Sequence, residues 1–171
     1  PLVLALPTLY PPPWDPDFGA TTPQAYIEFE LSGVALGTTA GGEFLPATVL
    51  TPPGPQTTLI ESYTAAGGID KVNRATLPAG TRVDTLEHGP THDLFLVRSA
   101  QAFPLRLYTF AFPGWRAEID NQPAEIEIAE PEGFIVVNVP AGAHEVRVFL
   151  GATPARSAGV ALSALSGAAL A

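Results

Sequence analysis

Cysteine and methionine are absent from the 171-residue sequence, and lysine occurs once, at Lys71. Without cysteine, the chain has no disulfide scaffold and no zinc site of the cysteine type. Because methionine is missing even as an initiator, we expect the chain to be processed or excised from a longer protein. No signal peptide is recognisable, since the apolar start Pro1–Leu9 has neither a basic region nor a cleavage site.

Positive charge is also scarce. Eight Lys and Arg residues stand against 17 Asp and Glu, which gives a net charge of −9 at pH 7. Such a surface repels nucleic acid, and no basic stripe with interleaved aromatic residues is present, so we predict no nucleic-acid partner. No glycine-rich loop follows a strand and opens a helix, and we therefore predict no nucleotide or other cofactor.

Apolar residues, proline and glycine are plentiful. Apolar residues make up 46% of the chain, and the 19 prolines and 16 glycines favour many turns and few long helices. About ten short segments have the pattern of strands whose neighbours in sequence pair antiparallel. The sequence therefore predicts an all-β fold, a single jelly-roll-like antiparallel β-sandwich with few short helices. The expected strands are 25–31, 57–63, 71–77, 81–86, 93–98, 105–111, 115–120, 124–128, 134–139 and 144–150, the last four forming a meander.

Three regions follow from this pattern. Residues 1–24, with the proline-rich stretch Pro11–Pro23, are expected to form an extended entry segment, and residues 25–152 the β-sandwich domain. Residues 153–171 are expected to begin a truncated membrane helix, because no ionisable side chain follows Arg156. The uncharged stretch is shorter than the roughly 20 residues that cross a bilayer, so a short amphipathic or buried terminal helix stays open as the alternative.

Several motifs carry a resemblance to a known group of proteins. They are Phe112-Pro113-Gly114-Trp115, Asp120, Gly133-Phe134, the stretch from Val139 to His144, Thr153-Pro154-x-Arg156, and upstream Gly37–Pro46. Together they resemble the C-terminal extracytoplasmic region of uncharacterised bacterial polytopic membrane proteins. The membrane half of those proteins is similar to GT-C glycosyltransferases of the protein mannosyltransferase type. The chain departs from the group at Asn121, where glycine is usual, and at Ala47-Thr48, where Arg-Trp is usual.

The resemblance implies a location rather than a reaction. It places the domain on the extracytoplasmic face of a membrane, anchored to and working with the membrane half of its own full-length chain. It brings no catalytic residues, because the acidic residues of GT-C enzymes lie in loops of the membrane half. We therefore expect an accessory domain that is not itself an enzyme and that positions a glycan or acceptor.

The sequence also offers candidate site residues. His88 and His92 could ligate a metal, but they flank a Gly-Pro turn without an evident third ligand, so we predict no metal site. Trp115 and Tyr108 could stack on a sugar ring, although core packing is the simpler role for Trp115. Glu43 lies in the upstream loop of the resemblance and is a further glycan candidate. His144 is expected to be a hydrogen-bonding turn residue.

Catalytic chemistry has little support in the sequence. No Gly-x-Ser-x-Gly motif is present, and alternation places Glu125 and Glu127 together on an exposed strand face rather than in a cleft. Two other functions stay open beside the accessory role: a carbohydrate-binding module of a secreted protein and a purely structural or protein-interaction domain. Solvent-exposed aromatic residues lining a groove would favour the carbohydrate-binding module.

Overall fold

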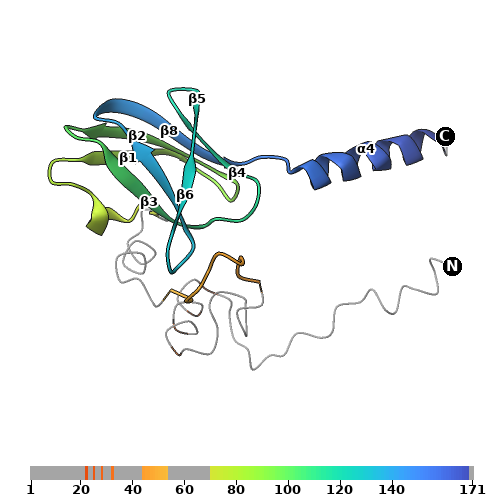
Figure 1. Cartoon of the computed structure of the whole chain (residues 1–171), viewed down its shortest axis with the longest axis horizontal. Coiled ribbons are helices and arrows are strands. Elements are labelled where there is room, and N and C mark those ends of the chain that lie inside the picture. Colours follow the sequence, from red (N-terminus) through yellow and green to blue (C-terminus); the bar gives the residue numbers. More distant parts are fainter. Residues whose placement is uncertain are drawn as a thin grey trace.

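A computed structural model describes residues 22, 25, 28, 32, 44–53 and 70–169 of the chain. The described part is mainly β-structure followed by one helix that projects away from it (Figure 1). The elements in chain order are η3 (Arg74–Thr76), β1 (Arg82–His88), β2 (His92–Ser99), β3 (Phe103–Phe110), β4 (Trp115–Ile119), β5 (Gln122–Ala124), β6 (Ile126–Ala129), β7 (Phe134–Val139), β8 (Gly142–Leu150) and α4 (Pro154–Ala169).

Two antiparallel sheets carry the strands. One has five strands in the order β1-β2-β8-β4-β5, and the other has three in the order β3-β7-β6. In the larger sheet β8 pairs along β2 from His92↔Phe149 to Ser99↔Gly142, and along β4 from Trp115↔Leu150 to Ile119↔Val146. The all-β, antiparallel fold predicted from the sequence is confirmed.

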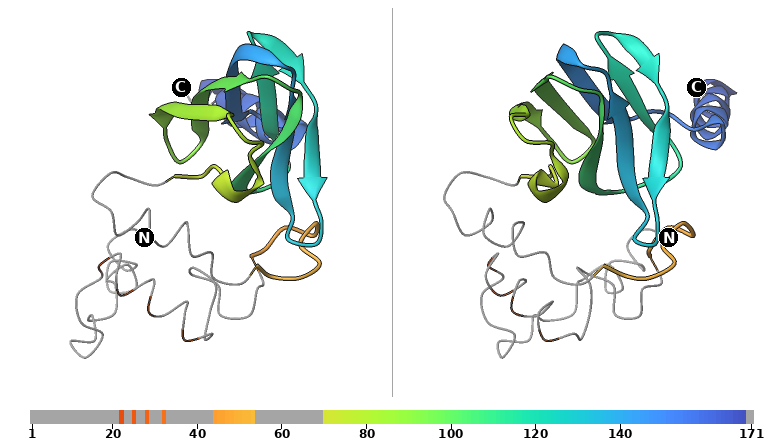
Figure 2. Two further views of the ribbon diagram at one scale, coloured as in Figure 1. Left: turned by 90° about the vertical axis from the view of Figure 1, so that its left-hand side faces the viewer. Right: turned by 60° about the vertical axis from the view of Figure 1, so that its left-hand side comes forward.

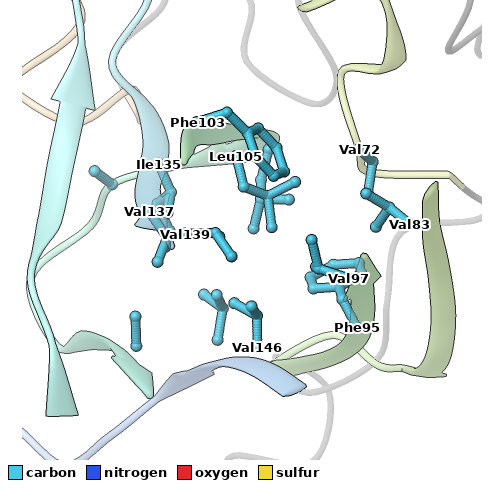
Figure 3. Close-up of a cluster of buried hydrophobic side chains, with 14 residues drawn as sticks. Val72, Val83, Phe95, Val97, Phe103, Leu105, Ile135, Val137, Val139 and Val146 are labelled. Atoms are coloured by element: carbon cyan, nitrogen blue, oxygen red, sulfur yellow. The ribbon is translucent and has the colours of Figure 1, made fainter. Parts of the chain in front are cut away.

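The core lies between the sheets, and side chains from both meet there (Figure 3). Every second residue of β2 is buried, so Phe95 and Val97 face inward while their neighbours face out. Leu105 of β3 and Val137 of β7 are fully buried opposite them. Because each sheet has an apolar inner face, neither can shield that face from water except against the other.

Positive-φ residues form the predicted turns. Asp120 and Asn121 have φ values of 50° and 63° and join β4 to β5 by a two-residue hairpin. This conformation matches the twist of the strands, and Asp and Asn adopt it more easily than most residues. Gly133 and Gly142, at φ 75° and 133°, lie in the turns predicted before and after β7.

The predicted meander of the last four strands is wrong. The single strand expected over 124–128 is two short strands, β5 in the larger sheet and β6 in the smaller, with Glu125 between them. The chain then returns from β7 in the smaller sheet to β8 in the larger. Proximity in sequence favours hairpins, but the need to bury the apolar faces of both sheets decides which sheet each strand joins.

Two other strand predictions are also wrong where the structure describes them. Over 71–77 the chain makes one bridge, Val72↔Leu107, and then the 3-10 turn η3, in which Thr76 Oγ1 donates to the Asn73 carbonyl. Ala25 and Glu28 are helical, and the Thr22 hydroxyl accepts a hydrogen bond from Ala25 N, as a helix-capping side chain does. Local hydrogen bonds thus override the apolar alternation in both places. The strand expected over 57–63 lies outside the described residues.

The uncharged tail is helical, as expected. Thr153 Oγ1 accepts a hydrogen bond from Arg156 N at the start of α4, which is a helix N-cap. Among the described residues, no helix is both long enough and apolar enough to span a bilayer.

Candidate functional site

The most buried charged group of the described chain is Asp93, the second residue of β2, whose side chain is 1% exposed. Its Oδ2 accepts a hydrogen bond from Lys71 Nζ at 3.0 Å, and its Oδ1 accepts one from His88 Nδ1 at 2.7 Å. Lys71 Nζ also donates to the Gly89 carbonyl at 3.2 Å. One carboxylate thus joins the residues before β1, the end of β1 and the start of β2.

The loop from His88 to His92 takes a shape that separates its two histidines. Gly89 N donates to the His92 carbonyl at 2.8 Å, and the His92 ring lies so close that a Cβ on Gly89 would be 2.6 Å from its Cε1. His88 turns to Asp93, whereas the nearest acid to His92 is Glu87, with Nε2 and Oε2 3.9 Å apart. Within the described residues, no three His, Asp or Glu side chains gather in a way that could hold a metal ion.

The paired Asp93 and His88 resemble half of an acid–base arrangement, since a carboxylate that orients an imidazole is common in hydrolases. However, the second carboxylate oxygen is bonded to the Lys71 ammonium, and a catalytic base also needs a substrate or nucleophile within hydrogen-bond reach. The contacts of this cluster are those of a structural brace between three chain segments.

A second cluster lies at the opposite end of β8. His144 Nδ1 donates to Asp120 Oδ2 at 2.7 Å, and the other Asp120 oxygen accepts a hydrogen bond from Glu145 N at 2.9 Å. The His144 ring also covers Gly142, where an added Cβ would come within 2.9 Å of Nε2. The bond to Asp120 holds the pKa of His144 above its ordinary value of 6.5, and the same bond holds the pKa of Asp120 below 3.8.

This second cluster confirms the hydrogen-bonding role predicted for His144. It links the β4–β5 turn to the start of β8, so two of the motif residues, Asp120 and His144, stabilise the same corner of the sheet. The carboxylate is 53% exposed, and its contacts with the described residues are to the His144 ring and the Glu145 backbone N–H at the start of β8.

The structure does not bring the glycan candidates together. Trp115 is half-buried and packs against the core from β4. Tyr108 lies on β3 in the other sheet, where its ring meets Phe134 edge to face at 5.7 Å between centroids. Glu43 lies outside the described residues. Glu125 and Glu127 are both exposed, as predicted, and Glu127 accepts a hydrogen bond from Asn138 rather than facing a cleft.

Sequence reasoning missed Asp93 and Lys71 as cluster members. The sequence did contain a signal for Asp93, because it alternates in register with the inward-facing Phe95 and Val97. A carboxylate buried at such a position must be paired with a hydrogen-bond donor or a positive charge. Nothing local indicated the partner, since Lys71 is 22 residues away.

Comparison with known proteins provides no relative: no family model matches the chain, and no curated protein or solved structure matches it significantly.

Proposed function

We propose that this chain is a non-catalytic, membrane-anchored accessory domain on the extracytoplasmic face of a polytopic membrane protein. The observation that carries the proposal is α4, a helix that stands clear of the sandwich and has no charged side chain after Arg156 (Figure 1). The motif resemblance to the C-terminal region of GT-C-like membrane proteins supports the same placement. In that setting the sandwich positions a glycan or acceptor for the membrane half of its chain.

The side chains of α4 are those expected in an apolar environment. Val160, Leu162 and Leu165 are 64 to 68% exposed, and the remaining positions after Arg156 are alanine, glycine and serine. A helix of a water-soluble domain normally has a charged face toward solvent and an apolar face toward the core. This helix has neither a charged face nor, among the described residues, a partner for its leucines.

The serine of the last turns fits the same environment. Ser166 Oγ donates to the Leu162 carbonyl at 2.9 Å, so the hydroxyl hydrogen is satisfied within the helix. Serine and threonine commonly bond to the helix backbone in this way where no water is available. At 1.5 Å per residue the 16-residue helix is about 24 Å long, which falls short of the roughly 30 Å hydrocarbon core. We therefore propose that α4 is the beginning of a membrane-embedded segment.

Support for a non-catalytic role comes from the two clusters. The Asp93 carboxylate bonds to two side chains, the Asp120 carboxylate bonds to one side chain and one backbone N–H, and both fix loops. Any reaction of the full-length protein is assigned in this proposal to the membrane half.

The test is flotation of the full chain with lipid vesicles. We expect the protein to float, and Leu162→Glu combined with Leu165→Glu to abolish flotation, because charge in the helix opposes insertion. The control is Gln101→Glu, which adds one negative charge, against two in the helix variant, on an exposed loop of the sandwich. Chemical unfolding of the sandwich should be the same for all three proteins. A protein that stays in solution, or a double variant that floats as well as the parent, would refute the membrane role.

A further inference from the structure

Backbone hydrogen bonds connect the root of α4 to one border of the sandwich. Gly151 N donates to the Gly114 carbonyl at 2.8 Å, and Ala111 N donates to the Gly133 carbonyl at 2.9 Å. Leu50 N in turn donates to the Pro131 carbonyl at 2.9 Å. We call the four connected segments, 44–53, 111–114, 130–133 and 150–153, the helix-side edge. Both views of Figure 2 show segment 44–53 beside the turn between β6 and β7.

Large apolar side chains point to solvent from this edge. Phe44 and Leu50 are each 68% exposed, and Phe112 is 43% exposed. They come from two separate chain segments that the hydrogen bonds bring to the same border. Exposed single apolar residues are common, but several along one border of a domain mark a contact surface.

The short linker between β8 and α4 limits the distance between this edge and the environment of α4. Residues 151–153 alone separate β8 from α4, and three residues span at most about 10 Å. Gly151 is also bonded to Gly114, and Thr153 Cγ2 would be 3.1 Å from a Cβ on Gly114, so the linker lies along the sandwich. If α4 begins in a bilayer, residues 112–114, which the Gly151–Gly114 bond holds to the linker, must therefore lie near the bilayer surface. Segments 130–133 and 44–53 lie farther along the same edge, connected to these residues by backbone hydrogen bonds.

The charges at the root of the helix suit lipid headgroups. Arg116 Nη2 donates to the Ala152 carbonyl at 3.4 Å, and Arg156 is exposed in the first turn of α4. Both can meet headgroup phosphates, although the chain as a whole carries a charge of −9. Glu132 of the edge is neutralised by Arg106 at 2.8 Å, while the exposed Glu130 would keep its carboxylate in the headgroup water.

We propose that the helix-side edge is a lipid-contact surface, with Phe112 inserted at the membrane interface beside the root of α4 and with Leu50 and Phe44 inserted farther along the same edge. The inference rests on the proposed function, since it requires α4 to enter the membrane. A lipid surface is favoured over a protein partner because the linker brings the edge to the bilayer without any other component. Shallow insertion of aromatic and aliphatic side chains beside a helix is a common way to dock on a membrane interface.

The absence of cysteine permits a direct test by single-site labelling of the full chain. An environment-sensitive fluorophore is attached to Leu50→Cys, Phe112→Cys, Leu162→Cys in α4 and Ala141→Cys, the control, in the turn before β8 at the far end of that strand. Each labelled protein is mixed with phosphatidylcholine vesicles, with or without phosphatidylglycerol, that contain lipids brominated in their acyl chains. We expect quenching at 50, 112 and 162 and none at 141.

The outcomes separate this inference from the proposed function. Quenching at 162 without quenching at 50 and 112 would overturn the lipid-contact edge, point to a protein covering, and leave the membrane role of α4 intact. No quenching at 162 would overturn both. Quenching at 141 as well would show a domain lying flat on the membrane and would overturn the edge.

Substitution provides a second readout that does not depend on the label. Phe112→Ser should weaken vesicle binding about tenfold, as expected for loss of one inserted large apolar side chain. Leu50→Ser should do the same, so that a folding defect in one variant leaves the other to decide. The control Leu86→Ser removes an exposed leucine from β1, at the far border of the larger sheet, and should leave binding unchanged. Equal affinities for all the proteins would overturn the inference.

Discussion

Lys71→Met should strongly destabilise the sandwich. The substitution keeps much of the side-chain volume but removes the ammonium group 3.0 Å from Asp93, whose side chain is 1% exposed. The carboxylate then remains inside the protein with His88 as its one side-chain partner in the cluster. Removing one member of a buried ion pair typically costs about 3–5 kcal/mol, because the other charge stays desolvated. We expect Lys71→Met to lower the free energy of unfolding by an amount in the lower half of this range, because 17% of the Lys71 side chain is exposed to water.

The measurement is equilibrium unfolding in urea, with stability obtained from the midpoint and slope. The matched control is Arg82→Met, which breaks the pair between Arg82 and Asp84, whose side chains are 72% and 33% exposed. An exposed pair contributes about 0–1 kcal/mol, so the control should be close to the parent. A double variant, Lys71→Met with Asp93→Leu, should recover much of the loss, because it leaves no unpaired buried charge. If Lys71→Met costs no more than Arg82→Met, the brace described for Asp93 is wrong.

Three further predictions concern the turns and the core. The fold raises the pKa of His144 and lowers the pKa of Asp120, so their pair stabilises the protein fully only between about pH 4 and about pH 6.5. Stability should fall as the pH rises through the folded His144 value and again as it falls through the folded Asp120 value. His144→Gln should flatten the alkaline decline in urea midpoints, and an unchanged profile would contradict the pairing. Gly133→Ala should lower the free energy of unfolding in urea by about 1–3 kcal/mol, because φ is 75° and the new Cβ would lie 2.8 Å from Val49 Cγ2. Gly159→Ala in α4, where nothing lies within 4 Å of the new Cβ, should instead raise the helicity measured by circular dichroism. A harmless Gly133→Ala would refute the close packing of segment 44–53. Trp115→Ala should lower the free energy of unfolding in urea by about 2–3 kcal/mol, because the ring is half-buried against the core. Replacing a fully buried tryptophan would cost roughly 3–5 kcal/mol. A loss below about 1 kcal/mol would place the Trp115 ring on the surface instead.

The turns and most of the strands could be predicted from the sequence, because they depend on residues close together in the chain. Asp120-Asn121 was predicted as a hairpin tip because these residues tolerate positive φ, and both have it. The strands β1, β2, β3, β4, β7 and β8 coincide with short apolar segments predicted as strands, and they were located to within a few residues. The uncharged run after Arg156 was likewise expected to be helical, and α4 occupies it. These features depend on near neighbours, which is why composition and period suffice to predict them.

The remaining features of the fold depend on contacts between residues far apart in the sequence. Residues 71–77 have a strand-like pattern, yet Val72 makes one bridge to Leu107 and the following residues prefer a 3-10 turn held by Thr76. The split of 124–128 between two sheets depends on which strand, β8 or β7, lies beside each half. No local pattern reports that choice, because it follows from burying both apolar faces at once.

The clusters divide in the same way. From the sequence alone, His144 could be assigned a hydrogen-bonding role beside its turn, since turn chemistry is local, and the absence of cysteine and of a basic stripe already excluded whole classes of site. Tertiary structure alone paired His144 with Asp120, 24 residues away, and brought Lys71 to Asp93 across 22 residues. It also joined the segments that carry Phe44, Leu50 and Phe112 along one border of the sandwich. Sequence patterns determine which face a side chain takes, but packing of the two sheets determines which distant side chain it meets.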